Sequence, residues 1–139
     1  MNNLFESARD AFVTADVDIK LQKTRDTAAS FQNGSLAMDA FGEPAPVQAP
    51  GRPERPLLVR AKHVRKRGFG TREGRAIMMH AIAHIEFNAI NLALDAVQRF
   101  EAMPEQFYAD WLRVADEEAY HFELIRAHMR HLGNDYGDY

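Results

Sequence analysis

Two stretches of this chain decide its fold: HIEFNAINLALDAVQRF at residues 84–100 and EEAYHFELI at residues 117–125. Each places a carboxylate among apolar residues that recur at helical spacing, at about 100° of rotation per residue. Glu86 is the carboxylate of the first stretch, and Glu118 with His121 takes that place in the second. Buried carboxylate and imidazole groups destabilise a protein unless a partner compensates them, and a metal ion is such a partner.

Helical geometry sorts the residues around both stretches into faces. The face of Glu86 is predicted to be buried and includes Met79, Ile82, Ala83, Ala89, Ile90, Ala93, Leu94, Val97 and Phe100. The opposite face is predicted to be polar and exposed, and it carries His80, His84, Asn88, Asn91, Asp95 and Gln98. The stripe of Glu118 contains Phe107, Trp111, Val114, Ala115, His121, Phe122, Ile125, Met129 and Leu132. We therefore expect the acidic groups to point into one helical interior.

A short break separates the two helices. The segment 101–105 contains Pro104, which helix interiors exclude, and so short a connection makes the flanking helices antiparallel. Glu86 lies sixteen residues before Ala102, and Glu118 lies sixteen residues after it. With about 1.5 Å of rise per residue, the two carboxylates are predicted to stand at the same height in the hairpin.

Composition divides the rest of the chain. Apolar residues at helical spacing predict short N-terminal helices, and a Pro- and Gly-rich stretch followed by basic residues predicts a linker without regular helix. Thr71 is a suitable N-cap for the first long helix, and Gly133 is a suitable stop for the second. The predicted organisation is short helices at 1–32, a linker at 33–70, a long helical hairpin at 71–133 and a tail at 134–139.

The overall composition narrows the function classes. The chain has 139 residues and no cysteine, so we expect one domain whose metal ligands, if any, are oxygen and imidazole. Its formal charge of −3 argues against general nucleic-acid or membrane affinity. The start has no signal-peptide pattern and no apolar run is long enough to span a membrane, which predicts a soluble cytoplasmic protein.

Glu118-Ala-Tyr-His121 places a carboxylate and an imidazole one helical turn apart, which is the Glu-x-x-His spacing of di-iron carboxylate bundles. This short motif is weak alone, but Glu86 at matching height strengthens it. Glu86, Glu118 and His121 are therefore a candidate metal site for iron or manganese. The alternative is a core ion pair in which Arg75 or Arg99 neutralises the carboxylates.

Four other polar residues are interpreted without a metal. Glu117 and His128 lie at the margin of the apolar stripe, where charged residues are usually solvated. His80 and His84 have the i, i+4 spacing of a zinc pair, but they share a face with amides and a carboxylate. We interpret these histidines as a polar face or a subunit contact.

Two remaining features have structural interpretations. Tyr108 and Trp111 are expected to be core residues of the bundle rather than redox-active groups. The basic run from residue 52 to residue 75 is interpreted as a solvated linker that neutralises acidic helices, in preference to a track for a phosphate backbone.

Three segments together resemble a known bacterial family: HAIAHIE at 80–86, RVADEEAYHF at 113–122 and HLGNDYGD at 131–138. They are similar to the ferritin-like proteins catalogued as domain of unknown function 455. The resemblance implies a ferritin-like four-helix bundle with a di-metal site. Glu86 then matches the carboxylate of the first helix, and Glu118 with His121 matches the second. No reaction is implied, because the family is uncharacterised.

The resemblance also implies that half of the bundle is missing. Family members continue into a second pair of helices, whereas this chain supplies one lone Glu and one Glu-x-x-His. We expect a truncated product, or a half-bundle that pairs with a second copy or another chain. The N-terminal helices are expected to cover only part of the apolar surface, so a homodimer is predicted, with two iron or manganese ions per completed bundle.

The resulting functional prediction is a di-metal carboxylate protein, an oxidoreductase or oxygenase of unassigned substrate, that needs a second hairpin to complete its site. The alternative is a non-catalytic interaction module: a truncated half-bundle whose apolar faces serve association and whose metal site has been lost. Iron content of the purified protein separates these two hypotheses.

Overall fold

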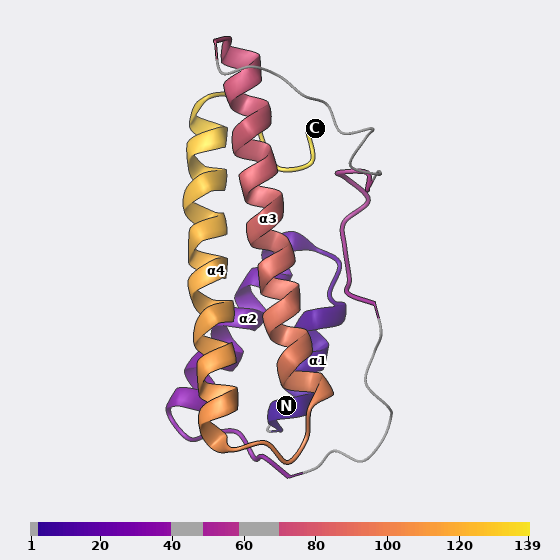
Figure 1. Ribbon diagram of the computed structural model, residues 1–139, viewed down its shortest axis with the longest axis vertical. Helices are drawn as coiled ribbons and strands as arrows, with labels where there is room; N and C mark the ends of the chain where they lie inside the picture. The colour runs from indigo at the N-terminus through magenta and orange to yellow at the C-terminus, as the bar shows by residue number, and fades with distance from the viewer. Residues whose placement is uncertain (1–2, 40–48, 59–69) are drawn as a thin grey trace.

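The protein is an all-α bundle, as predicted. The computed structural model describes residues 3–39, 49–58 and 70–139. Its helices are α1 (Leu4–Val13), α2 (Val17–Gln32), α3 (Arg72–Arg99) and α4 (Glu105–His131). The long helices α3 and α4 form an antiparallel hairpin, and α1 and α2 lie on one side of it, at the end nearest the α3–α4 connection (Figure 1). α1 packs against α2 and α3, and α2 packs against α4.

Side-chain caps and a glycine place the helix ends. The side-chain amide oxygen of Asn3 accepts hydrogen bonds from backbone N–H groups in the first turn of α1, and the carboxylate of Asp16 does the same for α2. The Thr71 hydroxyl accepts from Gly74 N at 2.9 Å, which confirms the predicted start of α3. Gly133 has a φ of +89° just beyond α4, so the predicted stop is also confirmed.

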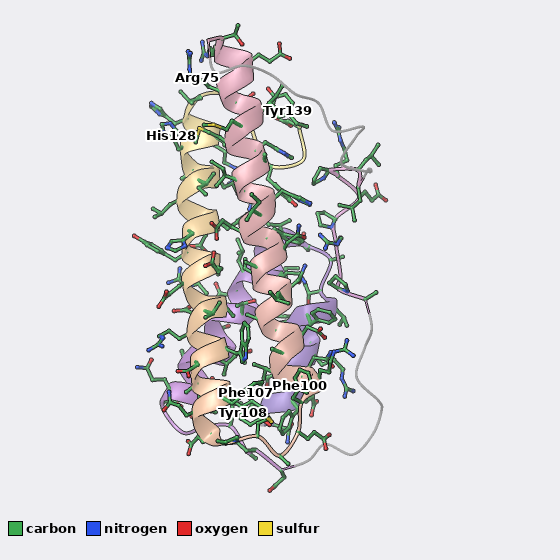
Figure 2. The ribbon with its side chains drawn as sticks, in the orientation of Figure 1. Arg75, Phe100, Phe107, Tyr108, His128 and Tyr139 are labelled. Atoms are coloured by element: carbon green, nitrogen blue, oxygen red, sulfur yellow. The ribbon has the colours of Figure 1, made fainter. Side chains whose placement is uncertain are left out.

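Aromatic residues close the end of the hairpin at the α3–α4 connection. Tyr108 is buried, and its hydroxyl donates to Phe100 O at 2.6 Å and accepts from Met103 N at 3.1 Å. Figure 2 shows Phe100, Phe107 and Tyr108 gathered at this end. The Phe107 ring meets the Phe100 and Tyr108 rings edge to face, with centroids 6.2 and 5.3 Å away. Tyr108 is therefore a core residue that holds the turn, as expected.

The N-terminal helices bury one side of the hairpin. α1 contributes Leu4, Phe5, Ala8, Ala11 and Phe12, all at most 2% exposed. α2 adds Leu21 to a core that includes Phe87 and Leu94 of α3 and Phe122 of α4. By length and composition alone α3 could cross a membrane, but a central bundle helix has the same composition, and α3 packs against both α1 and α4.

The buried face of α3 is rotated from the predicted one. His80, Asn91 and Gln98, predicted to be exposed, are at most 5% exposed, because α1 and the chain's C-terminal residues pack against the face opposite Glu86. Ile82 and Phe100, predicted to be buried, are 38% and 49% exposed. Of the predicted face, Ala83, Ile90, Ala93, Leu94 and Val97 are buried.

The polar histidines bind the C-terminal tail, which returns beside α3 (Figure 1). His80 Nε2 accepts a hydrogen bond from Gly137 N at 2.9 Å, and His84 Nδ1 lies 2.8 Å from the Tyr136 hydroxyl. The Tyr136 ring also stacks on His80 at 5.1 Å between centroids. The interpretation of His80 as part of an exposed polar face was therefore wrong, since His80 is buried and the tail supplies its partner within the chain.

The described parts of the predicted linker, 33–39 and 49–58, form neither helix nor strand. They dock on α1: Leu4 N donates to Ala37 O at 2.8 Å, and Gly51 N donates to Phe12 O at 2.9 Å. The most basic part of the run, Arg60, Lys62, Arg65, Lys66 and Arg67, lies outside the described residues, as do Pro44 and Pro46.

The contact between the C-terminal tail and His80 of α3 should weaken below pH 6.5. Burial lowers the pKa of His80 from its usual 6.5, with a further lowering by His84 that opposes the raising effects of Asp138 and Asp135. The unfolded chain therefore takes up a proton first as the pH falls, so this contribution to stability is complete above pH 6.5 and is lost on acidification toward the folded pKa.

Amide exchange of Gly137 across this pH range measures the effect. The variant His80→Gln keeps an acceptor oxygen without titrating, so its tail should stay protected on acidification. His131→Gln, at an exposed position, is the matched control and should behave like the wild type. Equal acid sensitivity in wild type and His80→Gln would contradict the assignment.

Candidate metal centre

The three predicted ligands converge between the long helices. Glu86 comes from α3, and Glu118 and His121 come from successive turns of α4. His121 Nδ1 lies 3.6 Å from Glu118 Oε2 and 3.9 Å from Glu86 Oε2, and one ligand atom from each of the three side chains lies within 4.8 Å of the others. The equal-height argument from the α3–α4 turn therefore placed these residues correctly.

These groups are close, yet they do not satisfy one another. Both distances from His121 exceed hydrogen-bond length, and Glu86 Oε2 is a buried oxygen without a hydrogen-bond partner. An unsatisfied buried acceptor costs about 1–3 kcal/mol, and more when it is charged. Such a group calls for a cation or proton that the described residues do not supply.

The burial of the three side chains is graded. Glu86 is 19% exposed and Glu118 is 24% exposed, whereas His121 is 48% exposed. The prediction that His121 lies on a buried stripe was thus wrong in degree. His121 turns toward the side of the hairpin that α1 and α2 leave uncovered, and there no described helix covers it.

The alternative of a core ion pair finds no support in the geometry. Arg75 and Arg99 lie on the same helix as Glu86, about 16 and 20 Å away along its axis, beyond the reach of the side chains. Arg99 instead pairs with Asp95 at 3.1 Å. Within the described residues, neither Glu86 nor Glu118 forms an ion pair with lysine or arginine.

The donor set fits a transition metal. Carboxylate oxygens and imidazole nitrogens bind such ions at about 2.0–2.2 Å, so ligands of one ion lie roughly 3–4 Å from each other. The separations of 3.6 and 3.9 Å match that spacing. Two carboxylates with one imidazole, and no sulfur, suit iron or manganese.

Apolar side chains surround this polar centre on the uncovered side of the hairpin. The helical rotation of about 100° per residue places them on the side of α3 and α4 that faces away from α1 and α2. We call this surface the open face, and its exposed apolar members include Met78, Ile82, Ile85, Leu92 and Val114. Ile85 is 62% exposed directly beside Glu86 in the sequence. Large exposed apolar patches commonly mark interfaces.

Phe87 is the site residue that the faces drawn from the sequence missed. It follows Glu86 directly and is fully buried, with its ring centroid 6.1 Å from Phe122 and 5.6 Å from Tyr136. Phe122 follows His121 in the same way. The two rings lie next to the ligands in the chain and fix the backbone that carries them. An aromatic residue directly after Glu86 and directly after His121 was the available signal.

Comparison with known proteins assigns the chain to a family. A family model described as "Protein of unknown function (DUF455)" matches residues 13–139. The chain belongs to the DUF455 family. The resemblance noted in the sequence is thereby confirmed, and this DUF455 chain also resembles an uncharacterized protein of Haemophilus influenzae (strain ATCC 51907 / DSM 11121 / KW20 / Rd). The two are 54% identical over 94 residues, which cover 63% of this chain and 33% of that protein. No solved structure matches the chain.

Proposed function

We propose that this DUF455 chain carries half of a ferritin-like di-metal carboxylate site, with Glu86, Glu118 and His121 as its ligands for iron or manganese. The observation that supports it most strongly is Glu86 Oε2, a buried carboxylate oxygen without a partner that faces Glu118 and His121. A bound cation would satisfy this oxygen and remove the repulsion between the two carboxylates.

One hairpin supplies too few ligands for two metal ions. Ferritin-like sites take a lone Glu from each of two helices and a Glu-x-x-His from each of two others. Two-fold pairing of this chain through the open face would duplicate Glu86, Glu118 and His121 into that set. We therefore propose a homodimer. The Haemophilus influenzae relative is longer, since the match covers 33% of it.

The proposed reaction class is oxidation or oxygenation, because bound iron or manganese supplies redox chemistry with dioxygen or peroxide. The chain's own residues orient this chemistry. Glu86 and Glu118 would hold the ions and offset their charge, and His121 would supply a nitrogen ligand. The exposed Ile82 and Ile85 exclude water once a second hairpin covers them.

A non-catalytic role is the second candidate, and the open face favours it. The same apolar surface would serve association of a half-bundle even without metal. The two functions differ in one measurable property, because only the first requires stoichiometric metal in the associated protein.

We expect iron or manganese to co-elute with the dimer in size-exclusion chromatography and to be absent from monomer fractions. The physical reason is that three ligands leave most coordination positions of two ions unfilled until a second hairpin arrives. Metal analysis of each fraction, with light scattering for mass, makes the measurement. Stoichiometric metal in a strictly monomeric fraction would rule out the shared site, and a metal-free dimer would favour the non-catalytic role.

Ile85→Asp tests the surface itself. A charge in the middle of the open face should shift the protein to monomer and release the metal without unfolding the chain, since Ile85 is 62% exposed. Ile19→Asp is the matched control, because Ile19 is 50% exposed on α2, away from the hairpin's open face. Dimer retained in Ile85→Asp would show that association uses another surface.

A further inference from the structure

A second polar cluster lies on the other side of α3, centred on Lys20 of α2. Lys20 is fully buried, and its Nζ donates to Phe12 O at 2.7 Å and to Asn91 Oδ1 at 2.6 Å. Both acceptors are neutral. Among the described residues no carboxylate forms an ion pair with Lys20, although buried lysine is otherwise found with such a partner.

Asn91 adds a donor that has no acceptor. The side chain is 3% exposed, and its amide oxygen faces Lys20, because the protonated amine of a lysine can only donate. The Asn91 Nδ2 group is left buried and without a hydrogen-bond partner. Native structures rarely leave such a group unsatisfied.

Arg52 brings a second cation to the same place. Gly51 N donates to Phe12 O, the oxygen that also accepts from Lys20, and a Cβ on Gly51 would stand 2.2 Å from Val13 O. Only glycine permits this close approach, which anchors the neighbouring Arg52 over α1. The Arg52 Nη1 atom is buried without an acceptor.

Both cations stand over one aromatic ring. The Arg52 guanidinium carbon lies 5.8 Å from the Phe87 ring centroid, and Lys20 Nζ lies 5.6 Å from it. Burial, and secondarily the charge of Arg52, lowers the pKa of Lys20 to about 7. The quadrupole of the ring attracts the cations but offers no hydrogen-bond acceptor.

We propose that a small oxyanion, a carboxylate or phosphate group, binds between Lys20, Arg52 and Asn91. Counting only the residues that the structure describes, the cluster holds two cationic side chains, two unsatisfied buried donors and no negative charge, which is the complement of such a ligand. The site faces away from the metal ligands, because Asn91 lies five residues after Glu86 and is therefore rotated by about 140° around α3. It is independent of the proposed metal function.

The thermal midpoint of the full chain in formate, phosphate and chloride at equal ionic strength tests the proposal. We expect formate or phosphate to raise the midpoint by about 3 °C over chloride once the anion exceeds its dissociation constant several-fold. A response to formate alone identifies a carboxylate ligand, and a response to phosphate alone identifies a phosphate ligand. Equal midpoints in all three salts would overturn the site.

Asn91→Asp is the matched variant. It places a carboxylate within 2.6 Å of Lys20 Nζ and so supplies the missing charge from within the chain. The variant should lose the extra anion response, while general salt effects act on both proteins alike. An unchanged response in Asn91→Asp would contradict the assignment.

A titration of the wild type needs no variant. Because a bound anion favours the protonated amine, formate or phosphate should raise the pKa of Lys20 from about 7 toward its usual 10.5, as followed by NMR. A pKa that is the same in these salts and in chloride would overturn the proposal.

Discussion

Glu86→Gln should weaken metal binding by more than about tenfold and at the same time stabilise the metal-free protein by about 1 kcal/mol. The affinity falls because the amide is a poor metal ligand. The apo protein gains stability because the substitution removes a buried carboxylate oxygen that has no partner and abolishes its repulsion with Glu118. Replacing a metal ligand gives these opposite effects on metal affinity and on stability. Replacing a purely structural carboxylate would instead lower the stability of the protein both with and without metal.

Iron titration and denaturant unfolding, each with and without chelator, measure the two quantities. Glu117→Gln is the matched control, since Glu117 is an exposed carboxylate directly before Glu118 on the same helix. It should leave both quantities unchanged. Full metal loading of the Glu86→Gln variant would contradict the assignment of Glu86 as a ligand.

Phe87→Ala should destabilise the protein by about 3–5 kcal/mol. The ring is fully buried and lies within 6.1 Å, centroid to centroid, of both Phe122 and Tyr136, so truncation leaves a cavity that α3, α4 and the tail share. The Lys20 and Arg52 cations would also lose the ring over which they stand.

Ile85→Ala provides the comparison at a position two residues earlier. Ile85 is 62% exposed, so its truncation should change the unfolding free energy of the monomer by about 0.5 kcal/mol or less. Denaturant unfolding below the association concentration gives both values. Equal losses in the two variants would mean that the open face is covered within the monomer, contrary to the described packing of α1 and α2.

Local sequence signals were sufficient to predict where the long helices begin and end, and at which height along the hairpin the candidate ligands lie. Thr71 and Gly133 mark helix ends through backbone hydrogen bonding and a positive φ, which depend on neighbours in the chain. The rise per residue is constant, so equal spacing of Glu86 and Glu118 from the turn was enough to bring them together.

Contacts between residues that are far apart in the sequence could be identified only from the tertiary structure. His80 and His84 look like members of a polar surface until the tail supplies a backbone N–H and the Tyr136 hydroxyl. Similarly, Asn91 and Lys20 are far apart in the sequence, and no periodic pattern relates a residue of α2 to a residue of α3. Their pairing depends on how α1 and α2 lie against the hairpin.

Sequence by itself therefore determined an all-α hairpin and the convergence of Glu86, Glu118 and His121, because helical rise and rotation relate residues along one helix or across one short turn. Only the tertiary structure decided which arc of α3 is buried and which is open. Periodicity fixes the angles between side chains on a helix, but the direction that becomes the core depends on which neighbours pack there. In this chain α1 and the tail cover the polar side of α3 and leave Ile82 and Ile85 exposed beside Glu86.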